Sequence, residues 1–211
     1  MPRTSPALHR ATPEAIAESA LALVDESGPQ ALSFRTLAER LGVSHATVQR
    51  RCTDLAGLLD LCTDHLAARL PEVPAGTDWA TGTELRFTAL YRELTAHPGL
   101  LLLRGSRPWL GRNLLARLVE PALAANLAVG MDPTRAMAVY RQMYLLTLGS
   151  AAFVDHRDPA AVTAASRAAL AALDPELFPV LAGHTEALLP PLTDHEVFRE
   201  ALRTLIRAAR P

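Results

Sequence analysis

Apolar residues recur every three or four positions along most of the chain, and this spacing predicts an all-α protein. Between residues 33 and 41, for example, Phe34, Leu37, Ala38 and Leu41 follow the i, i+3, i+4, i+7 stripe of an amphipathic helix. No stretch shows the clean alternation of apolar and polar residues that marks a half-buried strand. The helix formers Ala and Leu also outnumber the strand formers Val and Ile.

Residues that start and stop helices divide this pattern into two parts. Thr12, Ser33, Ser44 and Asp54 each precede a short apolar stripe, as helix N-cap residues do, so four short helices are expected before residue 70. After a linker over residues 71–77, longer helices are expected at residues 79–96, 108–127 and 133–154, from residue 159 onward, and after Asp194. The proline-rich segment 173–191 is expected to be half helix and half loop.

The segment 32–51 has the pattern of a helix-turn-helix. Two short helices that cross steeply need a small residue at their contact, which Ala38 provides, and a turn residue that tolerates positive φ, which Gly42 provides. Val48 would seal the crossing from the inside. Ser44 would cap the second helix and leave its N-terminal amides facing outward, where a phosphate can bind. The pattern indicates DNA binding, although paired short helices around a glycine also occur in other helical proteins.

The charge of the chain supports a nucleic-acid site only locally. The 211 residues include 21 basic residues, all of them arginine, and 22 acidic residues, which gives a net charge of −1. A field that draws the whole molecule to nucleic acid is therefore excluded. Between residues 28 and 55, however, four arginines stand against two acidic residues, which leaves a local charge of +2: Arg35, Arg40, Arg50 and Arg51 against Glu39 and Asp54.

Residues 16–60 resemble the DNA-binding domain of TetR-type (tetracycline-repressor-like) transcription regulators. The likeness lies in residue type and spacing over about 45 ungapped positions, carried by Ile16 to Leu21, Gly28, Leu32 to Ser44, Val48, Leu58 and Leu59. It implies a DNA-binding domain at residues 1–53, with an N-terminal arm at 1–11, and a helical ligand-binding and dimerisation domain at 54–211. Beyond residue 60 the likeness is loose.

The second short helix carries residue types that suit a DNA groove. Gln, Arg and short polar groups match base edges in the major groove, whereas other arginines suit phosphates. The expected DNA-contacting residues, most of them carried over from the resemblance, are Arg35, Thr36, Ser44, His45, Thr47, Gln49, Arg50 and Arg51. Of these, His45, Thr47, Gln49 and Arg50 are expected to lie away from Val48. Two positions depart from the family pattern: Gln49 stands where an aromatic residue is usual, and Leu55 where a basic residue is common.

The resemblance further implies that the longer helices form a bundle with a cavity for a small molecule. A few polar groups among aromatic residues and Met suit a largely apolar organic effector. The candidate ligand-binding residues, each of which is also a candidate for plain core packing, are Phe87, Leu90, Tyr91, Leu94, Leu101, Trp109, Asn113, Met137, Tyr140, Arg141 and Tyr144.

The final helix has an apolar face broader than a monomer's edge helix needs, which predicts an interface with a second copy of the chain. The expected interface residues are Val197, Phe198, Leu202, Leu205 and Ile206. A homodimer would place two recognition helices about one DNA turn apart, on a palindromic operator. The resemblance implies a repressor that a small organic molecule releases from this operator.

Other functional classes have weaker support. No HExxH motif, P-loop or GxGxxG motif is present, so an enzyme is not expected. Cys52 and Cys62 form no CxxC pair, so neither a metal site nor a cofactor is predicted. No spanning apolar segment or signal peptide is apparent, which predicts a cytoplasmic protein with no membrane partner. The alternative that remains is a helical ligand-binding or interaction protein with degenerate DNA binding, an interpretation that Gln49 and Leu55 keep open.

Overall fold

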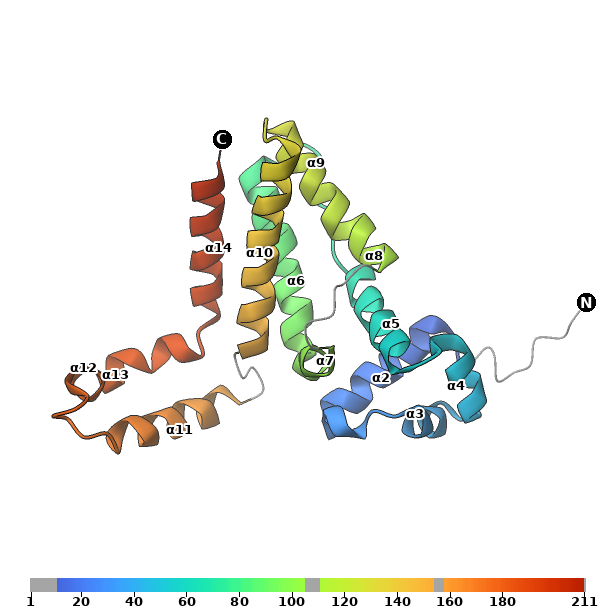
Figure 1. The fold of residues 1–211 in the computed structure, drawn as a ribbon, viewed down its shortest axis with the longest axis horizontal. Coiled ribbons are helices and arrows are strands. Elements are labelled where there is room, and N and C mark those ends of the chain that lie inside the picture. Colours follow the sequence, from blue (N-terminus) through green and yellow to red (C-terminus); the bar gives the residue numbers. More distant parts are fainter. Residues whose placement is uncertain (1–10, 105–110, 154–157, 211) are drawn as a thin grey trace, which may run out of the picture.

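The computed structural model describes residues 11–104, 111–153 and 158–210, and within these ranges it contains helices and no strands. The all-α prediction is therefore confirmed. The helices form an N-terminal group, a bundle of longer helices and an extended arm (Figure 1). No helix in these ranges is long and apolar enough to cross a membrane.

The N-terminal group packs around its own core. It contains α2 (Pro13–Ser27), a short 3-10 turn η1 (Pro29–Ala31), α3 (Phe34–Leu41), α4 (His45–Cys52) and α5 (Leu55–Ala68). Ile16, Leu37, Val48 and Leu58 are fully buried at its centre. These are the apolar stripe positions of four different helices, so the periodicity of the sequence accounts directly for this core.

The bundle has a second core. It contains α6 (Trp79–Ala96), α7 (Pro98–Arg104), α8 (Arg112–Leu114), the π-helical turn η2 (Leu115–Val119), α9 (Glu120–Ala128), α10 (Pro133–Phe153) and α14 (His195–Ala209). Phe87, Leu118, Val139 and Leu202 are among its most buried residues. The helix α5 contributes to both cores, Leu66 to the first and Ala67 to the second, so it links the two groups.

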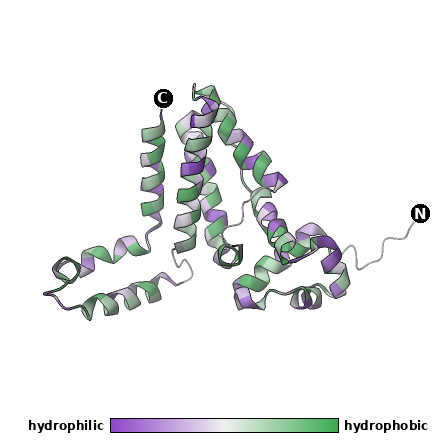
Figure 2. Cartoon of the chain, in the orientation of Figure 1, coloured by the Kyte–Doolittle hydropathy of each residue, from purple (hydrophilic) through white to green (hydrophobic). Residues whose placement is uncertain are grey.

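An arm extends from the bundle between α10 and α14 (Figure 1). It is formed by α11 (Pro159–Ala171), α12 (Pro179–Gly183), α13 (Thr185–Leu188) and the 3-10 turn η3 (Pro190–Leu192). None of these four elements contains a buried residue. Hydrophobic residues are nevertheless frequent along the arm (Figure 2), so its apolar side chains are exposed in a single chain.

Most predicted helix boundaries match the structure. The expected helix at 79–96 is α6, which Asp78 caps, and Asp54 and Asp194 cap helices with their side chains as predicted. The helix α7 is an addition to the predicted elements, and it begins at Pro98, a residue that suits the first position of a helix. The helix expected at 108–127 begins at Arg112 as far as the structure describes it, and a π-helical turn interrupts it.

Candidate nucleic-acid interface and ligand-binding bundle

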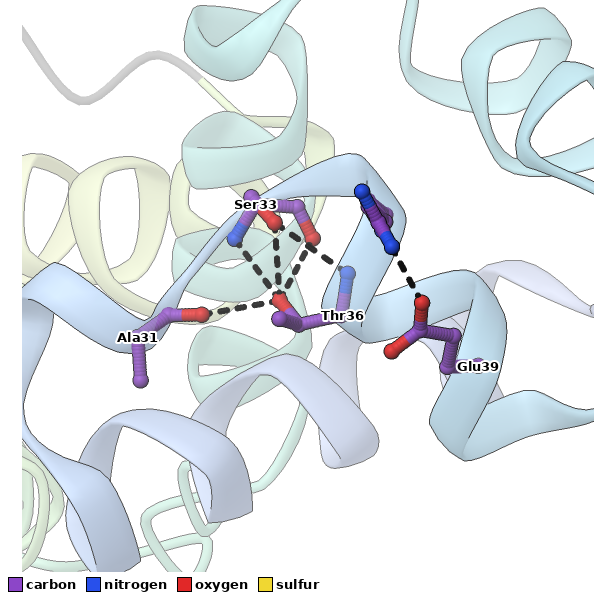
Figure 3. A network of polar contacts seen from close by, with 5 residues as sticks. Ala31, Ser33, Thr36 and Glu39 are labelled. Atoms are coloured by element: carbon purple, nitrogen blue, oxygen red, sulfur yellow. Dashed lines mark hydrogen bonds and ion pairs between the residues drawn. The ribbon is translucent and has the colours of Figure 1, made fainter.

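A capping box fixes the start of α3. The Ser33 hydroxyl accepts a hydrogen bond from the Thr36 amide at 3.1 Å, and the Thr36 hydroxyl accepts one from the Ser33 amide at 3.1 Å (Figure 3). The Thr36 hydroxyl also donates to the Ala31 carbonyl at 2.8 Å. Thr36, a predicted DNA contact, therefore holds the start of its own helix, and satisfying these backbone groups orients α3.

The turn between α3 and α4 depends on Gly42. This residue has φ of 63° and ψ of 39°, the left-handed conformation that glycine adopts without a Cβ clash. Its amide donates to the Ala38 and Glu39 carbonyls, and the Val43 amide donates to the Ala38 carbonyl at 3.0 Å. The turn predicted from the position of Gly42 is therefore present, and it sets the angle at which α4 leaves α3.

The inner side of α4 is anchored by three residues. Thr47, Val48 and Cys52 are 5%, 0% and 3% exposed. The Ser44 hydroxyl accepts a hydrogen bond from the Thr47 amide at 3.2 Å, and the two hydroxyl oxygens lie 2.9 Å apart. The prediction that Thr47 lies away from Val48 is wrong, because its side chain turns back to the N-cap and is buried with Val48.

The outer side of α4 is exposed and polar. His45, Gln49 and Arg50 all lie on it. The His45 ring packs edge-on against Phe34 of α3, with ring centroids 5.9 Å apart, so its orientation is held by the neighbouring helix. The structure thus brings together three of the predicted DNA-contacting residues on one accessible helix face, with Arg51 exposed beside them.

Ion pairs compensate the charge of two of the four arginines in this region. Arg35 pairs with Glu39 at 3.1 Å, and Arg40 donates two hydrogen bonds of 2.7 Å to the carboxylate of Glu26 on α2. The Arg40 hydrogen bond lowers the pKa of Glu26, so the pair stays charged at neutral pH. No ion pair involving the last two arginines of α4 occurs among the residues that the structure describes. The uncompensated charge therefore lies at the C-terminal end of α4.

The connection from α4 to α5 is tight and strained. Thr53 has φ of 62° and ψ of −60°, which is unfavourable for a β-branched residue. The Asp54 amide donates to the Cys52 carbonyl across this residue at 2.6 Å, and the Asp54 carboxylate accepts from the Gly57 amide at 2.7 Å. The end of α4 is thus fixed to the start of α5 by backbone contacts.

The predicted ligand-binding residues do not form one site. Phe87, Leu90, Tyr91, Leu94, Tyr140 and Tyr144 are buried in the bundle core, and Leu101 is partly buried beside it. The Tyr140 and Tyr144 rings stack with centroids 5.6 Å apart, and burial raises the pKa of Tyr140 to about 12. Met137 and Arg141 are exposed, and the Arg141 guanidinium lies over the Tyr144 ring, 5.8 Å from its centroid. Trp109 lies outside the described residues.

Asn113 connects the bundle to α5. The Asp64 carboxylate accepts hydrogen bonds from the Asn113 backbone amide at 2.7 Å and from its side-chain amide at 3.0 Å. Asn113 also lines a cavity of about 500 Å³ together with Arg86, Arg117 and the linker that follows α5. The Asp64 contact could not be predicted from local sequence signals, since the two residues lie 49 positions apart.

A second contact joins the N-terminal group to the bundle, at the C-terminal end of α6. The His97 Nδ1 atom lies 2.6 Å from a carboxylate oxygen of Asp25 on α2. Leu100 of α7 is buried in the N-terminal core. The N-terminal group and the bundle are therefore connected through α5 and through the end of α6 and α7.

The apolar face of α14 does not form a free surface. Phe198, Leu202 and Ile206 are 3%, 0% and 5% exposed and belong to the bundle core. These three residues, predicted to lie at an interface between copies, are covered in the single chain because α14 packs this face against α6 and α10. Leu205 is also packed partly against the core, and Val197 is exposed.

The chain is similar in sequence to a known transcriptional regulator. No model of a known protein family matches the chain. A helix-turn-helix-type transcriptional regulator of Saccharopolyspora erythraea is 31% identical over 189 residues, which cover 88% of this chain and 78% of that protein.

Two solved structures of ActR from Streptomyces coelicolor have the same fold. The apo form aligns with a TM-score of 0.76 at 23% identity, covering 98% of this chain and 96% of ActR. ActR is a TetR family protein, and its complex with actinorhodin aligns with a TM-score of 0.74 at 24% identity, covering 94% of this chain and 96% of ActR. The fold of this chain is that of ActR, a TetR family protein. The sequence relationship shows that this chain belongs to the helix-turn-helix-type transcriptional regulators.

Proposed function

We propose that the protein is a transcriptional repressor that binds a palindromic DNA operator as a homodimer and is released by a small organic molecule. The observation that carries the proposal is the arrangement of α4. Its inner side is locked by Val48 and Cys52, while His45, Gln49 and Arg50 are exposed on its outer side. A helix held in this way presents fixed side chains to the major groove.

The exposed residues of α4 are suited to two kinds of DNA contact, to bases and to phosphates. The Gln49 amide has the donor and acceptor that match the N6 and N7 edge of adenine. Arg50 and Arg51 supply charge for phosphates, which fix the register of the helix on the duplex. The polar Gln49 is therefore suited to reading bases at a position where the family usually has an aromatic residue.

A gel-shift assay with DNA from upstream of the protein's own gene, in excess nonspecific competitor, tests this function. Gln49→Ala is expected to weaken specific binding by about 5- to 100-fold and to leave nonspecific binding unchanged, because it removes one base contact. Arg51→Gln is expected to weaken binding to all sequences and to reduce its salt dependence.

The matched control is Arg207→Gln, which removes an exposed arginine on α14, and it should bind like the wild type. If no retardation occurs even at low salt, the protein does not bind this DNA and the alternative of degenerate DNA binding gains support. If competitor DNA displaces the fragment as readily as unlabelled fragment does, binding is nonspecific and the assignment of Gln49 is contradicted.

The arm supports a homodimer with an interface different from the predicted one. Leu177, Val180 and Phe178 are 72%, 66% and 44% exposed, and Leu145 of α10 is 51% exposed. Apolar helices with no buried residue in a single chain need another surface to cover them. A second copy provides this cover by a symmetric contact, as most soluble homo-oligomers do.

Charging the arm is therefore expected to dissociate the dimer. The double variant Leu177→Glu/Val180→Glu should elute as a monomer at micromolar concentration in size-exclusion chromatography with light scattering, because it would place two carboxylates in an apolar interface. Leu102→Glu is the control, since Leu102 is 70% exposed on α7, outside the arm. If the double variant stays dimeric, the arm is not the interface.

Effector release is expected to act through α5. Asp64 fixes Asn113 at the wall of the 500 Å³ cavity, and the other end of α5 is fixed to α4 by the hydrogen bond from the Asp54 amide to the Cys52 carbonyl. An effector that competes for Asn113 would free Asp64 and change the position of α5. Such a switch requires that the effector bind the two arrangements with different affinity.

A further inference from the structure

A second cavity lies between α6 and α14, away from α4 and from the cavity at Asn113. Its volume is about 250 Å³, and it is lined by Thr88, Tyr91, Arg92, Thr95, His195 and Arg199. The residues come from the outer side of α6 and from the first two turns of α14. Only Tyr91 of this set was expected to bind a ligand.

The wall of this cavity is positively charged. It contains two arginines, one on each helix, and no acidic residue. No ion pair involving Arg92 occurs among the described residues, while Arg199 contacts Glu196, which lies outside the wall. The guanidinium of each arginine can donate two parallel hydrogen bonds, which suits a carboxylate bound in this cavity.

The Thr88 hydroxyl group also favours a ligand that carries acceptor oxygens. The Thr88 Oγ1 atom is buried and has no hydrogen-bond partner in the described part of the chain. By contrast, Thr95 Oγ1, about two turns along the same wall, donates to the Arg92 carbonyl at 3.2 Å. A buried hydroxyl without a partner is costly, and an acceptor oxygen on a bound molecule would satisfy it.

The floor of the cavity is aromatic and rigid. The Tyr91 ring stacks on Phe198 with centroids 4.0 Å apart, and it meets the His195 ring edge-on at 5.7 Å. The Tyr91 hydroxyl lies 2.9 Å from His195 Nδ1, so the two side chains hold each other in place. Such a floor accepts the flat body of a small molecule whose charged group faces the arginines.

We propose that this cavity binds a small aromatic carboxylate, with Arg92 and Arg199 at the carboxylate, the Thr88 hydroxyl as a further donor, and Tyr91 against the ring. The site is separate from the DNA-binding face and from the proposed effector cavity. Its occupation joins the end of α6 to the start of α14, which are otherwise connected through the Tyr91 contacts.

Isothermal titration calorimetry of the full chain with benzoate tests this site, with benzamide as the neutral probe of the same shape and inorganic phosphate as the non-aromatic anion. Benzoate is expected to bind with one site per chain, and benzamide and phosphate at least tenfold more weakly, because charge-assisted hydrogen bonds and an aromatic floor are both used. Arg92→Gln and Arg199→Gln should each weaken benzoate binding about tenfold or more.

Arg207→Gln is the control on α14, because it removes a charge outside the cavity, and it should bind benzoate like the wild type. Circular dichroism confirms that each variant is folded. The proposal is overturned if benzoate does not bind, if benzamide binds equally well, or if both cavity variants keep wild-type affinity. DNA binding is measured separately, so a failure here leaves the repressor proposal untouched.

Discussion

Gly57→Ala is expected to destabilise the protein by about 2–3 kcal/mol and to weaken operator binding at least tenfold. A Cβ atom at this position would overlap the carbonyl oxygen of Cys52 and lie 3.1 Å from its carbonyl carbon. Both groups belong to the backbone, so no side-chain rotation relieves the overlap. Either α5 or the end of α4 must move.

The surrounding turn is already strained and hydrogen-bonded, so it cannot adjust to this movement at low cost. Thr53 already has a positive φ of 62°, and such residues carry about 1–3 kcal/mol of strain. The Asp54 amide donates to the Cys52 carbonyl at 2.6 Å, which keeps the two helix ends together, and the Asp54 carboxylate caps α5 at the Gly57 amide. A shift at Gly57 would therefore displace the C-terminal turn of α4, where Arg50 and Arg51 lie, and the displacement explains the expected loss of DNA affinity.

Thermal unfolding and the gel-shift assay measure the two effects. Gly183→Ala is the control, because Gly183 is helical and a Cβ there meets nothing within 4 Å. The control should leave both the unfolding temperature and the DNA affinity nearly unchanged. Wild-type stability for Gly57→Ala would show that α4 and α5 are not in contact at this turn.

Local signals in the sequence were sufficient for the DNA-binding part. The left-handed turn at Gly42 and the caps at Ser33, Ser44 and Asp54 are each fixed by a residue and its near neighbours. The close approach of Gly57 to Cys52 could not be predicted in this way. It depends on the angle between two helices, although the Asp-x-x-Gly spacing after α4 is a signal for the cap.

The remaining differences come from long-range packing. Periodicity identifies an apolar face but does not identify its partner, so the face of α14 was assigned to a second copy when α6 and α10 cover it. In the arm, by contrast, the sequence shows no strong helical stripe that would predict an interface. The apolar residues Leu177 and Val180 are nevertheless exposed in the single chain. Likewise, contacts such as Asp64 to Asn113 join residues that are distant in sequence.

Leu202→Ala is expected to destabilise the protein by about 3–4 kcal/mol, because it leaves a cavity in the bundle core. Leu202 is 0% exposed and lies in the same core as Phe87 and Val139. For a chain of this length the loss corresponds to a fall in unfolding temperature of roughly 6–16 °C. Val197→Ala, on the exposed side of the same helix, is the control and should change stability by less than about 0.5 kcal/mol.

Protein concentration separates core packing from an interface between copies. If Leu202 packs inside its own chain, the fall in unfolding temperature relative to the wild type is the same at protein concentrations that differ a hundredfold. A residue at an interface would instead shift the dimerisation equilibrium, so the difference would grow on dilution. A different result would contradict this packing: Leu202→Ala would unfold at the wild-type temperature, and its dimer would dissociate at a higher protein concentration than the wild-type dimer. In that case α14 would lie at the interface, and its contact with α10 would have to open in the dimer.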